Sequence, residues 1–236
     1  MKKYFSIITL SLLLVTGGCI NGFIGVSGDG NVVKEERNIA SFEAIDASGG
    51  LTLVLVNNSA NTVEVTADQN LMPNIETYVR GNTLHVDTKN IRNATELEVR
   101  INYETIRHMD LSGAVDISAI NTLKADKLTL EASGASEIIL YLEVETLTVD
   151  VSGASEITLS GRAENADYDG SGASSLNALE LITNVASISI SGAGEARIHA
   201  SEKLSAKVSG AGSIRYTGNP TKINKSISGA GSITKR

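Results

Sequence analysis

The tripeptide Ser-Gly-Ala recurs seven times in the second half of this 236-residue chain, and it constrains the fold more than any other feature. Successive copies lie 18 to 21 residues apart, and their glycines are Gly113, Gly134, Gly153, Gly172, Gly192, Gly210 and Gly229. A fixed period near 20 residues is typical of a solenoid, in which each repeat forms one coil and buries its apolar side chains against its neighbours. The sequence lacks the leucine-rich consensus, the calcium-binding nonapeptide and a small residue at every sixth position.

Two columns of apolar residues flank the tripeptide. The positions two residues before the glycine and four residues after it are mostly Ile, Val or Leu, as at Val151 and Ile157. Segments such as 145–149 alternate polar and apolar residues with the period of a β-strand. We therefore predict an all-β fold, a parallel β-helix whose coils of about 19 residues each hold three short strands. We expect Ser-Gly-Ala to form a tight corner, with the alanines filling a narrow interior.

An array of antiparallel hairpins, one per repeat, is the alternative fold. Two-residue turns such as Asn-Gly are scarce in this half of the chain. The tripeptide also occurs once per period and not at both ends of a hairpin. Both observations favour the parallel β-helix.

The first 18 residues (1–18) have the pattern of a signal peptide. A basic start and an apolar run over residues 4–15 precede Cys19, the only cysteine, and the run is shorter than the roughly 20 residues of a membrane span. The pattern resembles a bacterial lipobox, which predicts lipidation of Cys19 and, because Ile20 and not Asp follows, an outer-membrane lipoprotein. A plain signal peptide cleaved nearby is the alternative. Residues 19–39, rich in Gly, Asn and charge, predict a lipid-anchored flexible tether.

One domain is expected over residues 40–236, with an irregular part at 40–110 and the regular repeats at 111–236. Ser48-Gly49-Gly50 matches the corner pattern, which predicts a first coil there. We expect the segment between this corner and Gly113 to cap or widen the N-terminal end of the solenoid. Its predicted elements are a strand over 62–66, a short helix from Asn70, two strands that meet at Arg80-Gly81-Asn82, and a strand over 96–103.

Several stretches resemble the head GIN domain family, which occurs in bacteria of the Bacteroidetes type and carries the label of auto-transporter adhesins. They are residues 30–39, residues 42–50, residues 67–77 and the Ser-Gly-Ala-Gly repeats near the C-terminus. The resemblance extends over residues 28–235. It implies a right-handed β-helix and a cell-envelope protein, and it supplies no catalytic residues.

Two columns of acidic residues flank the corner in the first four repeats. Asp110, Glu131, Asp150 and Asp169 stand three residues before the glycine, and Asp116, Glu137 and Glu156 stand three residues after it. Carboxylates stacked about 4.8 Å apart repel one another, and Ca²⁺ would relieve that repulsion. No calcium-loop spacing accompanies them, so we favour a solvated edge. The weak metal candidates are Asp110, Asp116, Glu131, Glu137, Asp150 and Glu156.

The sequence predicts a non-catalytic adhesion or binding module for a polymer or protein ligand, without a cofactor. His85, His108 and His199 are scattered singly, with no nucleophile elbow and no metal-ligand spacing. Once residues 1–18 are removed, 27 acidic residues face 18 basic ones, which makes nucleic acid a poor partner. Two alternatives stay open: a polysaccharide-active β-helix enzyme, and an envelope protein that assembles end to end through its last coil at 228–233.

Overall fold

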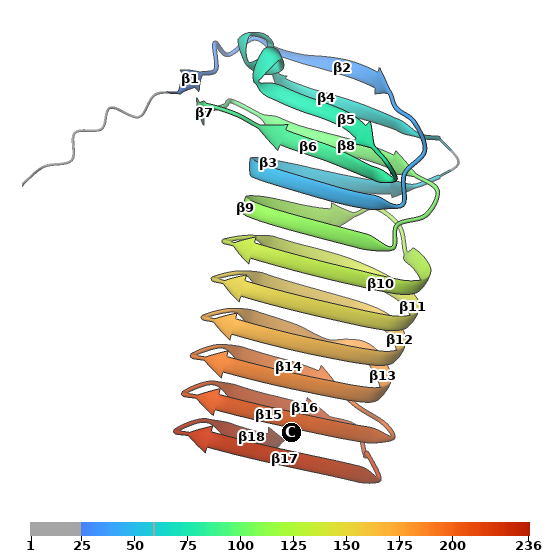
Figure 1. Ribbon diagram of the computed structural model, residues 1–236, viewed down its shortest axis with the longest axis vertical. Coiled ribbons are helices and arrows are strands. Elements are labelled where there is room, and N and C mark those ends of the chain that lie inside the picture. Colours follow the sequence, from blue (N-terminus) through green and yellow to red (C-terminus); the bar gives the residue numbers. More distant parts are fainter. Residues whose placement is uncertain (1–24, 59) are drawn as a thin grey trace, which may run out of the picture.

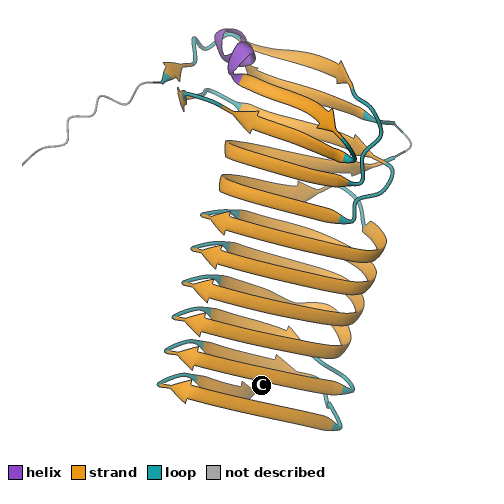
Figure 2. Cartoon of the chain, in the orientation of Figure 1, coloured by secondary structure: helices purple, strands orange, loops and turns teal. Residues whose placement is uncertain are grey.

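The computed structural model describes residues 25–58 and 60–236, which form a column of stacked coils with the N-terminal part at one end (Figure 1). The predicted signal peptide and Cys19 lie outside the described residues. Strands make up nearly the whole column, and the short helix lies at its N-terminal end (Figure 2). Within the described part of the chain, no helix is long and apolar enough to cross a membrane.

The regular coils pair in parallel with their neighbours, so the predicted parallel β-helix is confirmed. The central coils are β9 (His108–Ala119), β10 (Leu123–Gly134), β11 (Glu137–Gly153), β12 (Glu156–Gly172) and β13 (Ser175–Gly192). The later coils are split into β14 (Glu195–His199), β15 (Lys203–Gly210), β16 (Ser213–Thr217), β17 (Lys222–Gly229) and β18 (Ser232–Lys235). The expectation of three short strands per coil is wrong, because β11, β12 and β13 are each one long bent strand, while the coils before and after them are divided into two strands.

The corner glycines stack in one column, in which Gly134 pairs with both Gly113 and Gly153. Gly153 has a φ of 106°, a backbone conformation that side chains other than glycine rarely adopt. A Cβ atom there would lie 2.3 Å from the carbonyl oxygen of Gly134. The next residue, Ala154, donates its N–H to that same oxygen at 2.8 Å. The close approach of successive backbones therefore requires glycine at this corner.

In the regular coils, the buried side chains are apolar except for Thr183 and a short column of serines at the corner. Val151 and Ile157 are buried, as the two apolar columns predict. The expectation that the alanines fill the interior is wrong: Ala154 is exposed, and the residue after it, Ser155, is buried. The hydroxyl oxygen of Ser155 accepts the N–H of Ser136 at 3.2 Å, so the buried serine is satisfied by the neighbouring coil.

The N-terminal cap is the set of elements that cover the first coil, β3 (Ala44–Asn57). They are β1 (Val26–Ser27), β2 (Val32–Asn38), β4 (Thr62–Asp68), the 3₁₀ helix η1 (Gln69–Asn74), β5 (Ile75–Arg80), β6 (Thr83–Thr88), β7 (Ile91–Asn93) and β8 (Leu97–Tyr103). Antiparallel pairing joins β2 to β4, β4 to β8 and β5 to β6, whereas β3 pairs in parallel with β6, β8 and β9. The cap thus continues the solenoid sheet with a different strand order, and it contains the predicted short helix.

The boundary between tether and domain needs correction. Residues 32–38, assigned to the tether from the sequence, form β2 and pair with β4. The side chain of Asp68 is fully buried beneath this segment and accepts the N–H groups of Gly30 and Thr95, each at 2.7 Å. Burial alone would raise the pKa of Asp68, but the hydrogen bonds from Thr95 and Gly30 outweigh it and lower the pKa. The folded domain therefore includes residues that precede position 40.

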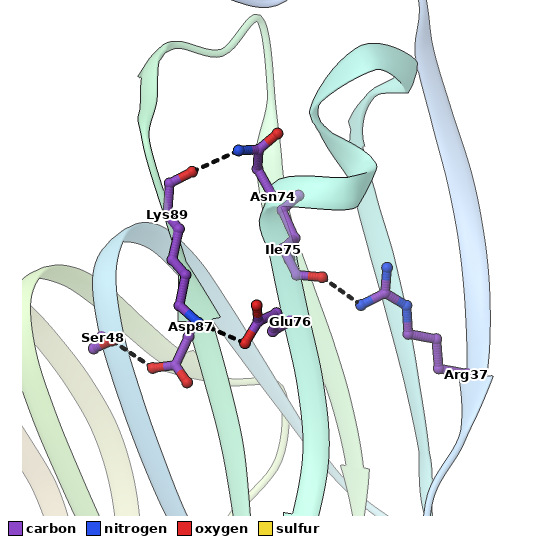
Figure 3. A network of polar contacts seen from close by, with 7 residues as sticks. All are labelled: Arg37, Ser48, Asn74, Ile75, Glu76, Asp87 and Lys89. Atoms are coloured by element: carbon purple, nitrogen blue, oxygen red, sulfur yellow. Dashed lines mark hydrogen bonds and ion pairs between the residues drawn. The ribbon is translucent and has the colours of Figure 1, made fainter. Parts of the chain in front are cut away.

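Side-chain contacts between distant residues hold the cap together (Figure 3). Arg37 donates to the carbonyl oxygen of Ile75 at 2.9 Å, which ties β2 to β5. Asn74 donates to the carbonyl oxygen of Lys89 at 2.8 Å, and the ammonium of Lys89 lies 2.7 Å from the carboxylate of Glu76. Ser48, at the first corner, donates to Asp87 of β6. The first three contacts join elements within the cap, and the contact of Ser48 with Asp87 attaches the cap to the first coil.

Candidate binding surface

The acidic residues that precede the corner lie in one exposed column. Strand pairing stacks Asp110, Glu131 and Asp150 on successive coils and continues the column with Asp46 and Asp169. A surface hollow of about 300 Å³ runs between these acids and the corner serines. Because the side chains point outward, water and salt screen the repulsion within the column.

The acidic residues that follow the corner form a separate column. Asp116, Glu137 and Glu156 lie on the strand segment that leaves the corner, and the N–H of Glu137 donates to Asp116 at 3.2 Å. The structure therefore divides the six metal candidates into two groups of three and does not bring the six together. In residues 25–58 and 60–236, no group of three or more His, Cys, Asp or Glu side chains has a geometry that could hold a metal ion.

Charge is segregated along the axis of the solenoid. Residues 110–194 contain 13 acidic and 3 basic residues, a net charge of −10. Residues 195–236 contain 2 acidic and 8 basic residues, a net charge of +6. An anionic ligand is therefore repelled by the central coils and attracted to the last ones.

Two of these basic residues belong to a column on the strand segment that follows each corner, five residues after the glycine. We call it the outer column, and strand pairing aligns its members as Ser118, Ile139, Thr158, Asn177, Arg197, Arg215 and Thr234. Arg197 and Arg215 are paired neighbours on β14 and β16. Together with Leu179 and Arg236 they line a hollow of about 500 Å³, which we call the arginine hollow.

One carboxylate lies beside these arginines. Glu195 forms ion pairs with Arg197, at 3.1 Å, and with Arg215. Both arginine side chains remain about half exposed, at 45% and 48%. A guanidinium presents five N–H donors in a planar fork, so one carboxylate shared by two arginines leaves donors available to a ligand.

A polar hollow adjoins the arginine hollow on the side of the central coils. It has a volume of about 270 Å³ and shares Leu179 with its neighbour, because an extra residue in β13 makes the strand bulge there. Its polar lining includes Thr158, Ser160 and Asn177. Beyond it, Ile139 and Tyr141 are exposed on β11. The face of the solenoid that carries the outer column, which we call the outer face, therefore changes along the axis. Its exposed groups are apolar on β11, hydroxyl and amide on β12 and β13, and basic on β14 and β16.

A third hollow, of about 530 Å³, lies at the bend on the far side of the coils from the glycine corner. Its charged residues face one another: Lys124 lies 2.6 Å from Glu143, and Arg107 lies 3.8 Å from Asp126. Arg107 also pairs with Glu43 at 3.2 Å. Because cations and carboxylates alternate here, this hollow favours no ligand charge.

The histidines do not assemble a catalytic group with the serines. His85 lies 3.1 Å from Asp46 and stacks on Tyr78, and His199 accepts the N–H of Thr183 at 3.3 Å. In the part of the chain that the structure describes, no hydrogen bond joins a serine to a histidine. The serine–histidine pairing that activates a nucleophile is therefore not formed among these residues.

The last coil has lysines at positions that are apolar in the preceding regular coils. Lys225 pairs with buried Ala206, and Lys235 pairs with buried Tyr216. The ammonium of Lys225 lies 4.6 Å from the centre of the Tyr216 ring, a cation–π contact. Ile223 and Ile227, at the remaining inward positions of β17, are about half exposed. Inward-pointing lysines are a known means of preventing an edge strand from pairing with another chain.

Sequence reasoning missed the arginine hollow, although the signal was present. The columns three residues from the glycine were compared across the repeats, and the same comparison at five residues would have aligned Arg197 with Arg215. The contribution of Leu179 depends on a bulge, and no pattern in the sequence predicts it.

Comparison with known proteins gives consistent matches. Residues 41–220 match the family described as "Putative auto-transporter adhesin, head GIN domain". A "putative adhesin" from Bacteroides fragilis is 25% identical with a TM-score of 0.86, over 90% of this chain and 100% of that one. A "putative adhesin" from Parabacteroides distasonis is 25% identical with a TM-score of 0.71, over 90% and 100% of the two chains. A "putative lipid binding protein" from the same species is 22% identical with a TM-score of 0.73, over 89% and 99%. No curated protein matches the chain.

Proposed function

Because the chain belongs to the head GIN domain family of auto-transporter adhesins, we propose that it is a non-catalytic adhesion module held at the cell envelope by a lipid on Cys19. The observation that carries this proposal is the outer face of the solenoid, where hollows of about 270 and 500 Å³ lie side by side on a regular scaffold. Solenoids present extended surfaces of this kind to polymers and to other proteins.

The lipid anchor is proposed from the sequence around Cys19, which lies outside the described residues. More than one acyl chain on that residue would hold the domain stably at a membrane. We expect wild-type cells to incorporate labelled fatty acid into the protein, and Cys19→Ser cells to incorporate none. Equal labelling of the two, or no labelling of either, would contradict the anchor.

Adhesion is tested on cells that produce the full chain, compared with cells that lack it. Both are applied to a panel of immobilised neutral and acidic polysaccharides, and the length of each polymer is measured after washing. We expect retention of the producing cells on at least one polymer, without shortening of that polymer. Equal retention of both cell types contradicts adhesion, whereas shortening that depends on the protein supports the polysaccharide-active enzyme.

A further inference from the structure

We propose that the arginine hollow binds the acidic groups of a polysaccharide, while neutral parts of the same ligand lie over the adjoining polar hollow. This inference rests on the proposed adhesive function and names its ligand class. It assigns binding roles to Arg197, Arg215 and Arg236, with Glu195 as a competing internal anion.

The geometry of the arginines carries the first step. Arg197 and Arg215 occupy the same position on adjacent parallel strands, so their side chains extend from backbones about 4.8 Å apart. Arg236 is held at the same hollow because its N–H donates to the carbonyl oxygen of Tyr216 at 2.9 Å. Each of the three guanidinium groups around the hollow can donate two parallel N–H bonds to a carboxylate or sulfate group.

The neighbouring residues favour a polysaccharide over a lipid surface. A membrane-binding face needs its apolar side chains beside its basic ones, so that the former enter the bilayer while the latter meet the headgroups. Here the exposed Ile139 and Tyr141 are separated from Arg197 by the hydroxyl and amide groups of Thr158 and Asn177. Hydroxyl and amide side chains suit the many hydroxyl groups of a sugar, and an exposed tyrosine ring offers an apolar face.

The charge segregation fixes where an acidic polymer would bind. Residues 110–194 carry a net charge of −10 and repel it, whereas residues 195–236 carry +6 and attract it. The acidic sugars would therefore lie over β14, β16 and β18, with the polar hollow left for uncharged units. Binding of this kind weakens as salt is added.

The test uses the detergent-solubilised full chain and polygalacturonate, a polymer of uronic acid units. The matched ligand is the same polymer with its carboxylates methyl-esterified. After removal of detergent, anionic phosphatidylglycerol vesicles are compared with neutral phosphatidylcholine vesicles, because a lipid on Cys19 would insert into both alike. We expect polygalacturonate to bind and the methyl ester to bind at least about tenfold more weakly, the loss expected when charged hydrogen bonds are removed. We expect equal association of the chain with the two kinds of vesicle.

Three variants locate the site. The double variant Arg197→Gln/Arg215→Gln should lower affinity for polygalacturonate about tenfold or more, because two charged donors are lost. Glu195→Gln should raise affinity, since it removes the anion that competes for the same guanidinium groups. Lys207→Gln is the control: it removes one positive charge from β15, on the segment that precedes the corner, and should change affinity less than about twofold.

Equal binding of polygalacturonate and its methyl ester would overturn the inference, and so would an unchanged affinity in the double variant. A preference for phosphatidylglycerol over phosphatidylcholine vesicles that is lost in the double variant would assign the arginines to a lipid surface and overturn it as well. If the chain binds a neutral polysaccharide independently of Arg197 and Arg215, the inference fails while the proposed adhesion stands. If no polymer of the panel is bound, both fail.

Discussion

A central coil and the last coil share one backbone register but lie in different surroundings. Strand β13 has a paired neighbour on each side, and Ile190 on it, two residues before the corner glycine like Ile227, is 3% exposed. Strand β17 has a paired neighbour on one side, and Ile227 on it is 50% exposed. The same repeat is thus core in the middle of the column and surface at its end. In a solenoid, the neighbours of a coil decide whether its residues are buried.

The largest expected effect comes from burying a charge in a central coil. Ile157→Asp should lower the free energy of unfolding by about 3 kcal/mol or more, because an unpaired carboxylate is placed in an apolar interior. Ile233→Asp, at the equivalent position in the last coil, should cost clearly less because that coil can fray into water. Chemical denaturation monitored by circular dichroism measures both.

Ile139→Asp is the control for that comparison, since Ile139 is half exposed and adjacent to a buried position of the same strand. It should leave the unfolding midpoint almost unchanged. Equal losses in Ile157→Asp and Ile233→Asp would show that the column unfolds as one unit, contrary to the difference described above.

The next effect tests the close approach of corner backbones. Gly153→Ala should lower the free energy of unfolding by about 1–3 kcal/mol. Alanine disfavours the positive φ, and its Cβ would meet the carbonyl oxygen of Gly134. Gly81→Ala separates the two causes: Gly81 also has a positive φ, but a Cβ there has no neighbour within 4 Å. Thermal unfolding should rank Gly153→Ala below Gly81→Ala in stability, and the reverse order would contradict stacking at the corner.

At the N-terminal end we expect a smaller and pH-dependent effect. Asp68→Asn should loosen residues 28–30 and 94–95, because an amide cannot accept both N–H groups through two oxygens. The native pKa of Asp68 is lowered, so its contribution is present above the unfolded pKa near 3.8 and is lost as the pH falls through the native value. The protection factors of the Gly30 and Thr95 amides, which compare exchange with the intrinsic rate at the same pH, should fall on acidification in the wild type.

In Asp68→Asn the protection factors of the same two amides should be low already at neutral pH and should change much less on acidification. Exchange in the regular coils should be unchanged, since Asp68 contacts only the cap in the hydrogen bonds described. Protection of Gly30 that is identical in the variant and the wild type would contradict the role of Asp68.

The smallest expected change in stability concerns the lysines of the last coil. Lys225→Ile should alter the free energy of unfolding by less than about 1 kcal/mol, because the residue is exposed. It should nevertheless increase self-association, since an inward charge no longer protects the edge strand. Lys222→Ile, an exposed change on the same strand, is the control. Sedimentation should show concentration-dependent mass for Lys225→Ile only, and equal behaviour of the two variants would contradict a protective role of Lys225.

The sequence predicts the regular coils well because every repeat obeys the same local rule. The spacing of the corner glycines and the two apolar columns, as at Val151 and Ile157, are enough to deduce parallel stacking. The orientation of the alanines was mistaken because a corner breaks the strict alternation of a strand. Ala154 is exposed and Ser155 is buried because the chain has already turned at Gly153.

The cap and the arginine hollow were less predictable, for different physical reasons. The cap depends on single contacts between residues about 40 positions apart, such as Arg37 with Ile75, and no periodic pattern marks such pairs. Strand β2 was assigned to the tether because its charged residues conceal the pairing with β4. The arginine hollow combines two aligned repeats with a bulge at Leu179, which only the folded chain brings together.

The central claim is that the last coils, and not the central ones, bind an acidic ligand. The most direct measurement follows the ¹H–¹⁵N side-chain signals of the arginines while polygalacturonate is added to the full chain. We predict that the signals of Arg197 and Arg215 shift with the polymer, while that of Arg162 in the central coil β12 stays in place. The claim would be contradicted if the side-chain signal of Arg162 shifted while the signals of Arg197 and Arg215 did not.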